Sequence, residues 1–407
     1  MKKNKSTLIF KNRILPPHTN KKIFSKNLIK LSKFLKEISV NIDGKKDAFN
    51  VFSKEYKLGF KKENIKKYDH FKTVVIIGMG GSILGAKAIY SFLKYKIKKK
   101  FIFFDNLDDM KIKSFMKKKS YKNILFVIIS KSGNTIETLV NLNLMKKIKL
   151  SKFNSIVITE NSDNALRNFA DKHTIPIIFH KNYIGGRYSV LSEVGIVPAY
   201  LMGLNIFKLR KNLKKYLINK DIKFLQDSTT KLANILQQKK ETNLVFLNYS
   251  PELEKFLYWC QQLIAESLGK NKKGFFPVIS NVPKDHHSLL QLYLDGPRDK
   301  LFHIFSLETK IKEKINTKKY TNQINYLHNK SLNKVKIAQK NAIIKSFKKY
   351  KIPFREFKIK KLNEQTLGEL FSYYFLETAI VGKLIDVNPF DQPAVEQVKI
   401  YTKKLLK

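Results

Sequence analysis

The sequence predicts an α/β protein with two doubly wound parallel-sheet domains and helical N- and C-terminal extensions. Three observations lead to this prediction. The chain has 407 residues, which is longer than a single hydrophobic core normally grows. From Thr73 onward, short apolar runs alternate with helix-length segments, a pattern typical of buried parallel strands. A second series of the same kind starts near Asn243, so we expect a second, smaller α/β domain.

The elements follow from these runs in chain order. The first half has five candidate strands: Thr73–Gly78, Phe101–Asp105, Ile124–Ser130, Ser155–Thr159 and Ile175–His180. The second half has four: Leu244–Asn248, Phe275–Ser280, Phe302–Leu307 and Phe354–Ile359, with helices at about 252–268, 333–349 and 366–383. We therefore divide the chain into a helical N-terminal extension (1–50), a first α/β domain (51–202), a helical connector (203–240), a second α/β domain (241–387) and a C-terminal helix (388–407).

The charge and the cysteine content limit the classes of function and of cellular location that fit this sequence. The formal net charge of +48 would suit nucleic acid, but only six of the 80 basic residues are arginine, and nucleic-acid surfaces draw heavily on arginine forks. We interpret the lysine excess as a composition bias and expect no nucleic-acid partner. Cys260 is the single cysteine, which excludes an internal disulfide. No apolar run is long enough for a membrane span or a secretion signal, so we expect a cytoplasmic protein without a membrane partner.

Two turns at the ends of predicted strands could bind a phosphate. Gly78-Met-Gly-Gly-Ser82 and Ser130-Lys-Ser-Gly-Asn-Thr135 each join a strand to a helix, where backbone N–H groups and the helix dipole attract an anion. The first turn fails the dinucleotide pattern, because its third glycine would fall on Ile83. The alternatives are purely structural roles: an ordinary N-cap at Ser82 and a capping box of Asn134 with Glu137.

Glu266 is the candidate general base. The apolar spacing of residues 256–268 predicts a helix that ends near Gly269 in a left-handed turn, which places Glu266 in the last turn. There the helix dipole disfavours the carboxylate, so we expect a raised pKa. Gln262 lies one turn earlier on the same face. The alternative is an exposed surface glutamate.

Two further segments could contribute to a site. Arg187 follows two glycines in Tyr183–Ser189, and a retained arginine in a lysine-rich chain indicates a need for the planar fork, although a surface turn would look the same. His286 and His287 are adjacent, with no Cys or His at ligand spacing, so an acid/base histidine is a better functional interpretation than a metal site. A structural histidine remains the alternative.

Taken together, these motifs resemble one family. Gly78–Ser82, Ser130–Glu137, Gly185–Ser189, Gln262 with Glu266–Lys270, His287-Ser, and Asp391–Lys399 occur in the order found in glucose-6-phosphate isomerases. The resemblance covers about residue 50 to the end. It implies two sugar-isomerase (SIS) domains, each with a parallel five-stranded sheet, in a homodimer that needs neither cofactor nor metal.

The resemblance also implies roles. The substrate would be a sugar phosphate, and the reaction the reversible interconversion of glucose 6-phosphate and fructose 6-phosphate through a cis-enediol. The implied substrate-binding residues are Gly81, Ser82, Ser130, Lys131, Ser132, Thr135, Gln262 and Gln392. Glu266 would move the proton between C2 and C1, and Arg187 would stabilise the developing negative charge. His287, supplied by the neighbouring subunit and assisted by Lys399, would open the ring.

The chain departs from the family pattern at three places: Leu268 replaces an asparagine, Ile83 an acidic residue, and His286 a glutamine. Between the two histidines we choose His287, because Ser288 fixes the register. Two other functions stay open at this point. A sugar-phosphate-sensing SIS-type regulator would need the phosphate turns but not Glu266, His287 and Lys399. A nucleic-acid-binding protein would show steeply salt-dependent affinity for DNA.

Overall fold

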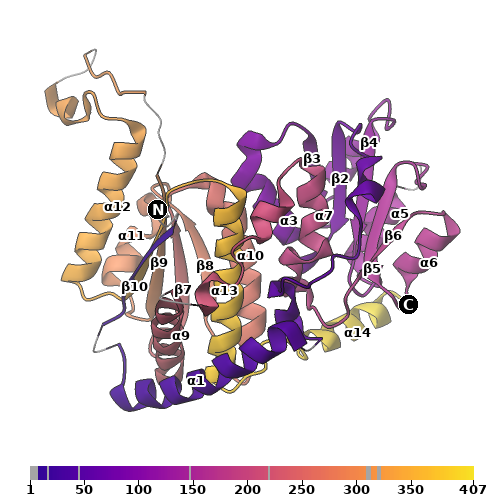
Figure 1. The fold of residues 1–407 in the computed structure, drawn as a ribbon. Helices are drawn as coiled ribbons and strands as arrows, with labels where there is room; N and C mark the ends of the chain where they lie inside the picture. Colours follow the sequence, from indigo (N-terminus) through magenta and orange to yellow (C-terminus); the bar gives the residue numbers. More distant parts are fainter. Residues whose placement is uncertain are drawn as a thin grey trace, which may run out of the picture.

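The computed structural model describes residues 8–15, 18–44, 46–145, 148–218, 221–308, 313–318 and 322–407. Two five-stranded sheets lie side by side with helices between them and outside them (Figure 1). The predicted fold class is confirmed. Each strand expected from the apolar runs is present, with ends that differ by at most a few residues.

The first sheet is entirely parallel. Its strands are β2 (Thr73–Gly78), β3 (Lys100–Phe104), β4 (Ile124–Ile129), β5 (Ser155–Glu160) and β6 (Ile177–His180), in the order β3-β2-β4-β5-β6. Alternate residues of β2 enter different cores. Val74 and Ile76 pack toward α3 (Gly81–Leu93) and α7 (Glu193–Leu201), whereas Val75 and Ile77 pack toward α4 (Asp109–Met116), α5 (Ile136–Leu144) and α6 (Ala165–Lys172). Helices therefore cover both faces, as in a doubly wound domain.

The second sheet has the order β1-β10-β9-β7-β8. Its parallel strands are β7 (Asn243–Asn248), β8 (Phe276–Asn281), β9 (Lys300–Leu307) and β10 (Phe354–Ile359). The inner face is covered by α9 (Asp221–Gln238), α10 (Glu254–Leu268) and α13 (Glu364–Leu384), and the outer face by α11 (His286–Asp295) and α12 (Leu332–Lys349) (Figure 1). α10 also packs against α3, which joins the two halves in one core.

The fifth strand of this sheet corrects the expectation for the N-terminus. Residues 8–13 form β1 (Leu8–Arg13), which pairs antiparallel with β10, so this sheet is not wholly parallel. The segment alternates as a strand does: Leu8 is buried and Phe10 stacks on Phe224, while Lys11 and Arg13 are exposed on the other face. A helix follows only at α1 (Lys21–Gly44).

The remaining helices are short or terminal. α2 (Lys62–Lys66) precedes the first sheet, α8 (Ile206–Arg210) leads to α9, and α14 (Val395–Leu405) ends the chain. Short 3-10 helices occur at 48–52, 94–96, 186–191, 215–217, 251–253 and 322–327. In the described part of the chain, no helix is long and apolar enough to cross a membrane.

Candidate active site

The strand order of the first sheet predicts a crevice at the carboxyl ends of β2 and β4. The chain leaves β2 toward β3 on one side and returns to β4 on the other, so the strand order reverses between β2 and β4. Loops after two such strands diverge and leave a space at their carboxyl ends, where ligands of open α/β sheets bind. Both predicted phosphate turns follow these two strands and therefore border the same crevice.

The turn after β2 needs glycine because other segments approach it closely. Gly80 has a positive φ of 50°, and a Cβ there would lie 2.7 Å from Nε2 of Gln262. A Cβ on Gly81 would lie 2.1 Å from the backbone carbon of Gly186. The turn thus brings the helix of Gln262 and the loop of Arg187 to the edge of the first sheet. Ser82 is half-buried in the first turn of α3, whose N-cap is Gly80, so the N-cap alternative for Ser82 is wrong.

The turn after β4 gathers three hydroxyl groups. The Oγ of buried Ser130 lies 2.9 Å from Oγ1 of Thr135, and the N–H of Asn134 donates to Oγ of Ser132 over 3.4 Å. Gly133 has a φ of 64°, and a Cβ there would collide with the side chain of Asn164. The N-cap of α5 is Thr135, whose hydroxyl makes no capping bond.

The capping box considered for this turn is wrong. Asn134 is not the cap, because its Oδ1 accepts from the N–H of Ala165 over 3.0 Å in the neighbouring loop. Lys131 is anchored beside the turn: its ammonium donates to the carbonyl of Asn182 over 2.8 Å and lies 3.2 Å from Glu160. The hydroxyl groups, rather than this ammonium, remain available to an anion.

Arg187 uses all three guanidinium nitrogens. Nη1 lies 3.3 Å from Oε2 of Glu266 and 3.0 Å from Oε1 of Gln392. Nε donates to Ser267 over 2.8 Å, and Nη2 donates to the carbonyl of Asp391 over 2.8 Å. The residue is only 3% exposed. A lysine could not reach these acceptors with one ammonium, which explains why an arginine is kept here.

Glu266 and Gln262 meet on one face of α10. Nε2 of Gln262 donates to Oε1 of Glu266 over 2.9 Å, and the Glu266 side chain is 31% exposed. Oε1 of Gln262 is buried and has no hydrogen-bond partner among the described residues. Glu266 thus combines a fixed cation, a fixed amide and access from the crevice, and the free amide oxygen could accept a hydroxyl of a bound sugar.

Gly269 ends α10 in a way that differs from the prediction. The helix does end at Leu268, which places Glu266 in the last turn, but Gly269 has a φ of −74° and is not left-handed. A Cβ at this position would lie 2.5 Å from the carbonyl oxygen of Ala265. Close backbone approach, rather than a left-handed conformation, therefore requires this glycine.

Sequence reasoning missed two groups of this site. Ser267 accepts a hydrogen bond from Nε of Arg187, and its hydroxyl lies 2.8 Å from that of Tyr188. The indole N–H of Trp259 donates to the carbonyl of Arg187 over 3.2 Å. The position of Ser267 directly after Glu266 was the available signal. The partners of Trp259 lie far away in the sequence, and no local pattern indicates them.

His287 and Lys399 are not brought to this cluster within the chain. His287 is exposed in the first turn of α11, on the face of the second sheet opposite to α10. Its neighbour His286 is half-buried, with Nε2 3.4 Å from the hydroxyl of Tyr249, and burial together with adjacent His287 lowers the pKa of His286. Lys399 is exposed on α14 and forms an ion pair of 2.6 Å with Glu396 on the same helix.

The cluster can move a proton beside a charge that it stabilises. A carboxylate next to a buried guanidinium, with hydroxyl groups in a turn at the carboxyl end of the first sheet, suits an anionic substrate that passes through an oxyanion. Within the described residues, no three His, Cys, Asp or Glu side chains are grouped so that they could hold a metal ion.

Comparisons with known proteins agree with this description. The model of the phosphoglucose isomerase family matches residues 35–280. A glucose-6-phosphate isomerase from Methanocaldococcus jannaschii is 34% identical over 360 residues, which cover 85% of this chain and 88% of that protein. One from Leptospira biflexa is 30% identical over 370 residues, covering 83% and 81%.

Solved structures show the same fold. A hypothetical protein from Thermus thermophilus has a TM-score of 0.83 at 25% identity and covers 98% of this chain and 99% of its own. A glucose-6-phosphate isomerase from Chlamydia trachomatis has a TM-score of 0.76 at 17% identity, with 98% and 88% covered. At that identity, the second likeness describes the arrangement of the elements.

Proposed function

The chain belongs to the phosphoglucose isomerase family, and from this premise we propose that it is an enzyme that interconverts glucose 6-phosphate and fructose 6-phosphate. The observation that carries the proposal is the contact of Glu266 with Arg187, because an aldose–ketose isomerisation needs a base beside a fixed cation. The activity would place the enzyme in glycolysis and gluconeogenesis, in the cytoplasm.

The phosphate is held by the two turns at the switch point. The hydroxyls of Ser130, Ser132 and Thr135, together with the backbone at Gly81 and Ser82, present donors at two helix N-termini, and Lys131, which is paired with Glu160, lies beside the second turn. A ligand fixed there by its phosphate would extend toward α10, which packs on α3. Gln262 and Gln392 would orient its hydroxyl groups.

The chemical step moves one proton between C2 and C1 and a second proton between their oxygens. In the open-chain aldose, Glu266 removes the proton on C2, the C2 electrons form the enediol double bond, and the C1 carbonyl oxygen becomes an enediolate that Arg187 stabilises. The hydroxyl proton on the C2 oxygen passes to the C1 oxygen across the cis-enediol, and the protonated Glu266 returns its proton to C1, so that the C2 oxygen becomes the ketone. No oxidant is consumed, because C1 is reduced as C2 is oxidised. Exclusion of water would protect the enediolate.

Ring opening needs an acid/base group besides Glu266, and among the described residues neither His287 nor Lys399 lies at the cluster. We assign it to His287 of a second subunit in a homodimer, assisted by Lys399. Two features support this assignment: His287 is exposed, and the second sheet lies between its helix and α10. A side chain directed outward on that face can serve a neighbouring molecule more readily than its own Glu266.

A turnover assay tests the proposal. Purified protein and fructose 6-phosphate should produce glucose 6-phosphate, measured through a coupled dehydrogenase, and mannose 6-phosphate serves as a second substrate for specificity. A sugar-phosphate-sensing regulator would bind either sugar without turnover. Binding without product formation would therefore reject the catalytic proposal in favour of that alternative.

A further inference from the structure

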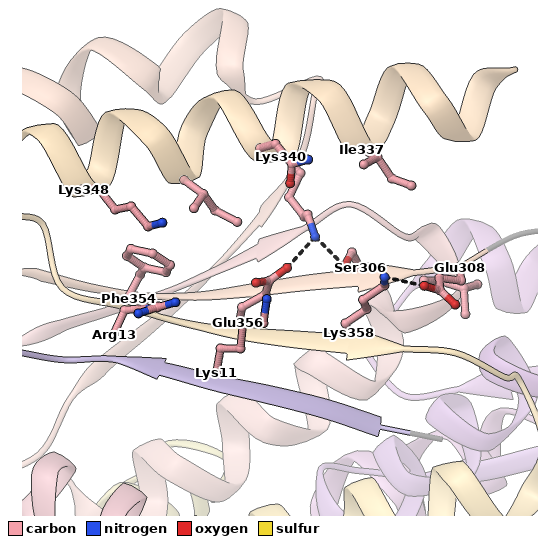
Figure 2. Close-up of a pocket in the computed structure, with 13 residues that line it drawn as sticks. Lys11, Arg13, Ser306, Glu308, Ile337, Lys340, Lys348, Phe354, Glu356 and Lys358 are labelled. Carbon is pink, nitrogen blue, oxygen red and sulfur yellow. Dashed lines mark hydrogen bonds and ion pairs between the residues drawn. The ribbon is translucent and has the colours of Figure 1, made fainter. Parts of the chain in front are cut away.

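A groove of about 270 Å³ lies on the outer face of the second sheet, between α12 and the edge strand β1 (Figure 2). The strand register explains its lining. Arg13 of β1 pairs with Phe354 of β10, and Lys11 pairs with Glu356, so these side chains project from the same face. α12 covers β9 and β10 on this face but does not cover β1, and the uncovered strip is the floor of the groove.

The charges around the groove are unbalanced. The lining contains five basic and two acidic side chains, so three positive charges have no acidic counterpart within it. Buried Glu356 is neutralised by Lys340 of α12 at 2.5 Å, and Lys358 pairs with Glu308 at the far end (Figure 2). The groove therefore has a surplus of positive charge.

That surplus comes from three exposed side chains. Lys11, Arg13 and Lys348 line the groove and have no ion-pair partner among the described residues. Arg13 and Lys348 lie near the ring of Phe354 at one end of the groove (Figure 2). An anion bound there would receive the fork of Arg13 and the ammonium of Lys348 from opposite walls.

The presence of Arg13 distinguishes this groove from the rest of the lysine-rich surface. The chain has six arginines and 74 lysines. The other five arginines have described partners: Arg187, Arg210 and Arg355 donate to buried acceptors, Arg167 donates to Asn161, and Arg298 lies over the ring of Tyr350. Arg13 has no such partner in the described structure, although its fork faces a cavity that could hold one.

We propose that this groove binds a compact organic phosphate at a site separate from the catalytic crevice. Its volume is just below the roughly 300–1,000 Å³ of sites for drug-sized ligands, which favours a small molecule. The fork of Arg13 and the ammonium of Lys348 match a phosphate group, and Phe354 with Ile344 offers an apolar wall for the remainder of the ligand. The second sheet separates the groove from α10, so the two sites share no residues.

Phenyl phosphate is a suitable probe, because it combines a phosphate with a ring that can lie against Phe354. We expect isothermal titration calorimetry to detect a binding event that weakens at least about tenfold in the double variant Arg13→Gln/Lys348→Gln. Turnover of fructose 6-phosphate should stay within about twofold of wild type, because neither residue borders the crevice.

A matched control removes the same charge elsewhere. Lys345 and Lys349 are exposed on the same helix but do not line the groove, so Lys345→Gln/Lys349→Gln should leave phenyl phosphate affinity within about twofold. Asn341→Trp keeps the charge but fills the groove from its α12 wall, and should also abolish the binding event.

Three results would overturn the proposal. Equal weakening by both double variants would mean general attraction to surface lysine. Loss of the binding event only in Ser132→Ala/Thr135→Ala would place phenyl phosphate at the catalytic phosphate turns. Binding of a DNA duplex, but not of phenyl phosphate, that depends on Arg13 and Lys348 would make the groove part of a nucleic-acid surface.

Discussion

Glu266 is the residue whose replacement tests the chemistry most directly. Glu266→Gln keeps the shape and the contacts with Gln262 and Arg187 but cannot accept a proton. We expect kcat to fall by about 10²- to 10⁴-fold with little change in KM, because a transition-state proton transfer is lost while phosphate binding stays intact. Steady-state kinetics in both directions measure this. Glu254→Gln on the same helix is the control, and near-normal turnover of Glu266→Gln would mean that another residue is the base.

The hydroxyls of the second turn should show the opposite kinetic pattern. Ser132→Ala and Thr135→Ala each remove a neutral donor to a charged phosphate, a loss of roughly 1.5–3 kcal/mol in binding. We expect KM for the sugar phosphate to rise more than kcat falls. Ser114→Ala, an exposed hydroxyl on α4, provides the control. If KM does not change, the hydroxyls of this turn have only a structural role.

At the scale of the elements, a buried ion pair joins β10 to α13. Nη2 of Arg355 lies 2.9 Å from Oε2 of Glu377, the Ser228 hydroxyl of α9 donates to that carboxylate over 2.6 Å, and Nε of Arg355 donates to His303 of β9 over 2.9 Å. Both charged residues are at most 2% exposed. The pair therefore connects the second sheet to the helices on its inner face.

Breaking this pair on one side should be costly. Arg355→Met leaves the Glu377 carboxylate buried without its counter-charge, and we expect the free energy of unfolding to fall by about 3–5 kcal/mol. Arg355→Met/Glu377→Leu removes both charges and should recover a large part of that loss. Urea unfolding measures both variants. If the double variant is no more stable than the single variant, the hydrogen bonds and ion pair of this network stabilise the fold by more than the unpaired Glu377 carboxylate destabilises it.

Glu193 in turn anchors the segment before β2 to α7. Its buried carboxylate accepts the N–H of Gly59 over 2.7 Å and the hydroxyl of Tyr56 over 3.1 Å. Burial alone would raise the pKa of the Glu193 carboxyl, but His180, Lys181 and the backbone donors outweigh it and lower the pKa from 4.5 to about 2. A lowered pKa means that the charged form is favoured in the folded state.

The sign of the pH dependence follows from this shift. The stabilisation is fully present above pH 4.5 and is lost as the pH falls toward about 2, at roughly 1.4 kcal/mol per pH unit and roughly 3 kcal/mol in all. Glu193→Gln should be less stable than wild type at pH 7, and the difference should narrow at pH 3.5. Urea unfolding at the two pH values measures this, with exposed Glu63→Gln as control. A difference that does not depend on pH would show that the charge of Glu193 does not stabilise the fold.

At the scale of the whole molecule, the proposed dimer can be tested by complementation. If each site combines Glu266 of one chain with His287 of the other, chains with Glu266→Gln and chains with His287→Ala should restore activity when they are mixed after dissociation. Each heterodimer would contain one site with both lesions and one with neither. Random pairing makes about half the dimers mixed, so about a quarter of all sites should recover.

The two single variants and a mixture that has not been dissociated are the controls. Mass measurement must confirm that heterodimers are present. No activity above the single variants in such a sample would mean that the site is built within one chain, or that His287 is not the ring-opening residue. The variant His286→Ala distinguishes these two explanations, because it should lose activity only if His286, rather than His287, opens the ring.

The sequence by itself determined where the strands and helices lie and at which strand ends the candidate site is found. The runs from Thr73 and Asn243 are buried on both faces, so their apolar character is a local property that predicts strands correctly. The spacing of residues 256–268 likewise placed Glu266 in the last turn of α10. Both turns that we propose for phosphate binding could be located because glycine and hydroxyl residues at a strand end reflect local backbone requirements.

Only the tertiary structure decided which distant segments meet. β1 joins β10 from the opposite end of the chain, and a short basic stretch such as Leu8–Arg13 gives no local sign of that partner. Three further features also depend on packing between segments far apart in sequence: the partners of Arg187, the N-cap at Thr135, and the placement of α10 and α11 on opposite faces of the second sheet. The spacing of apolar residues indicates which residues are buried. Which residues they contact depends on how the two sheets and their helices pack together.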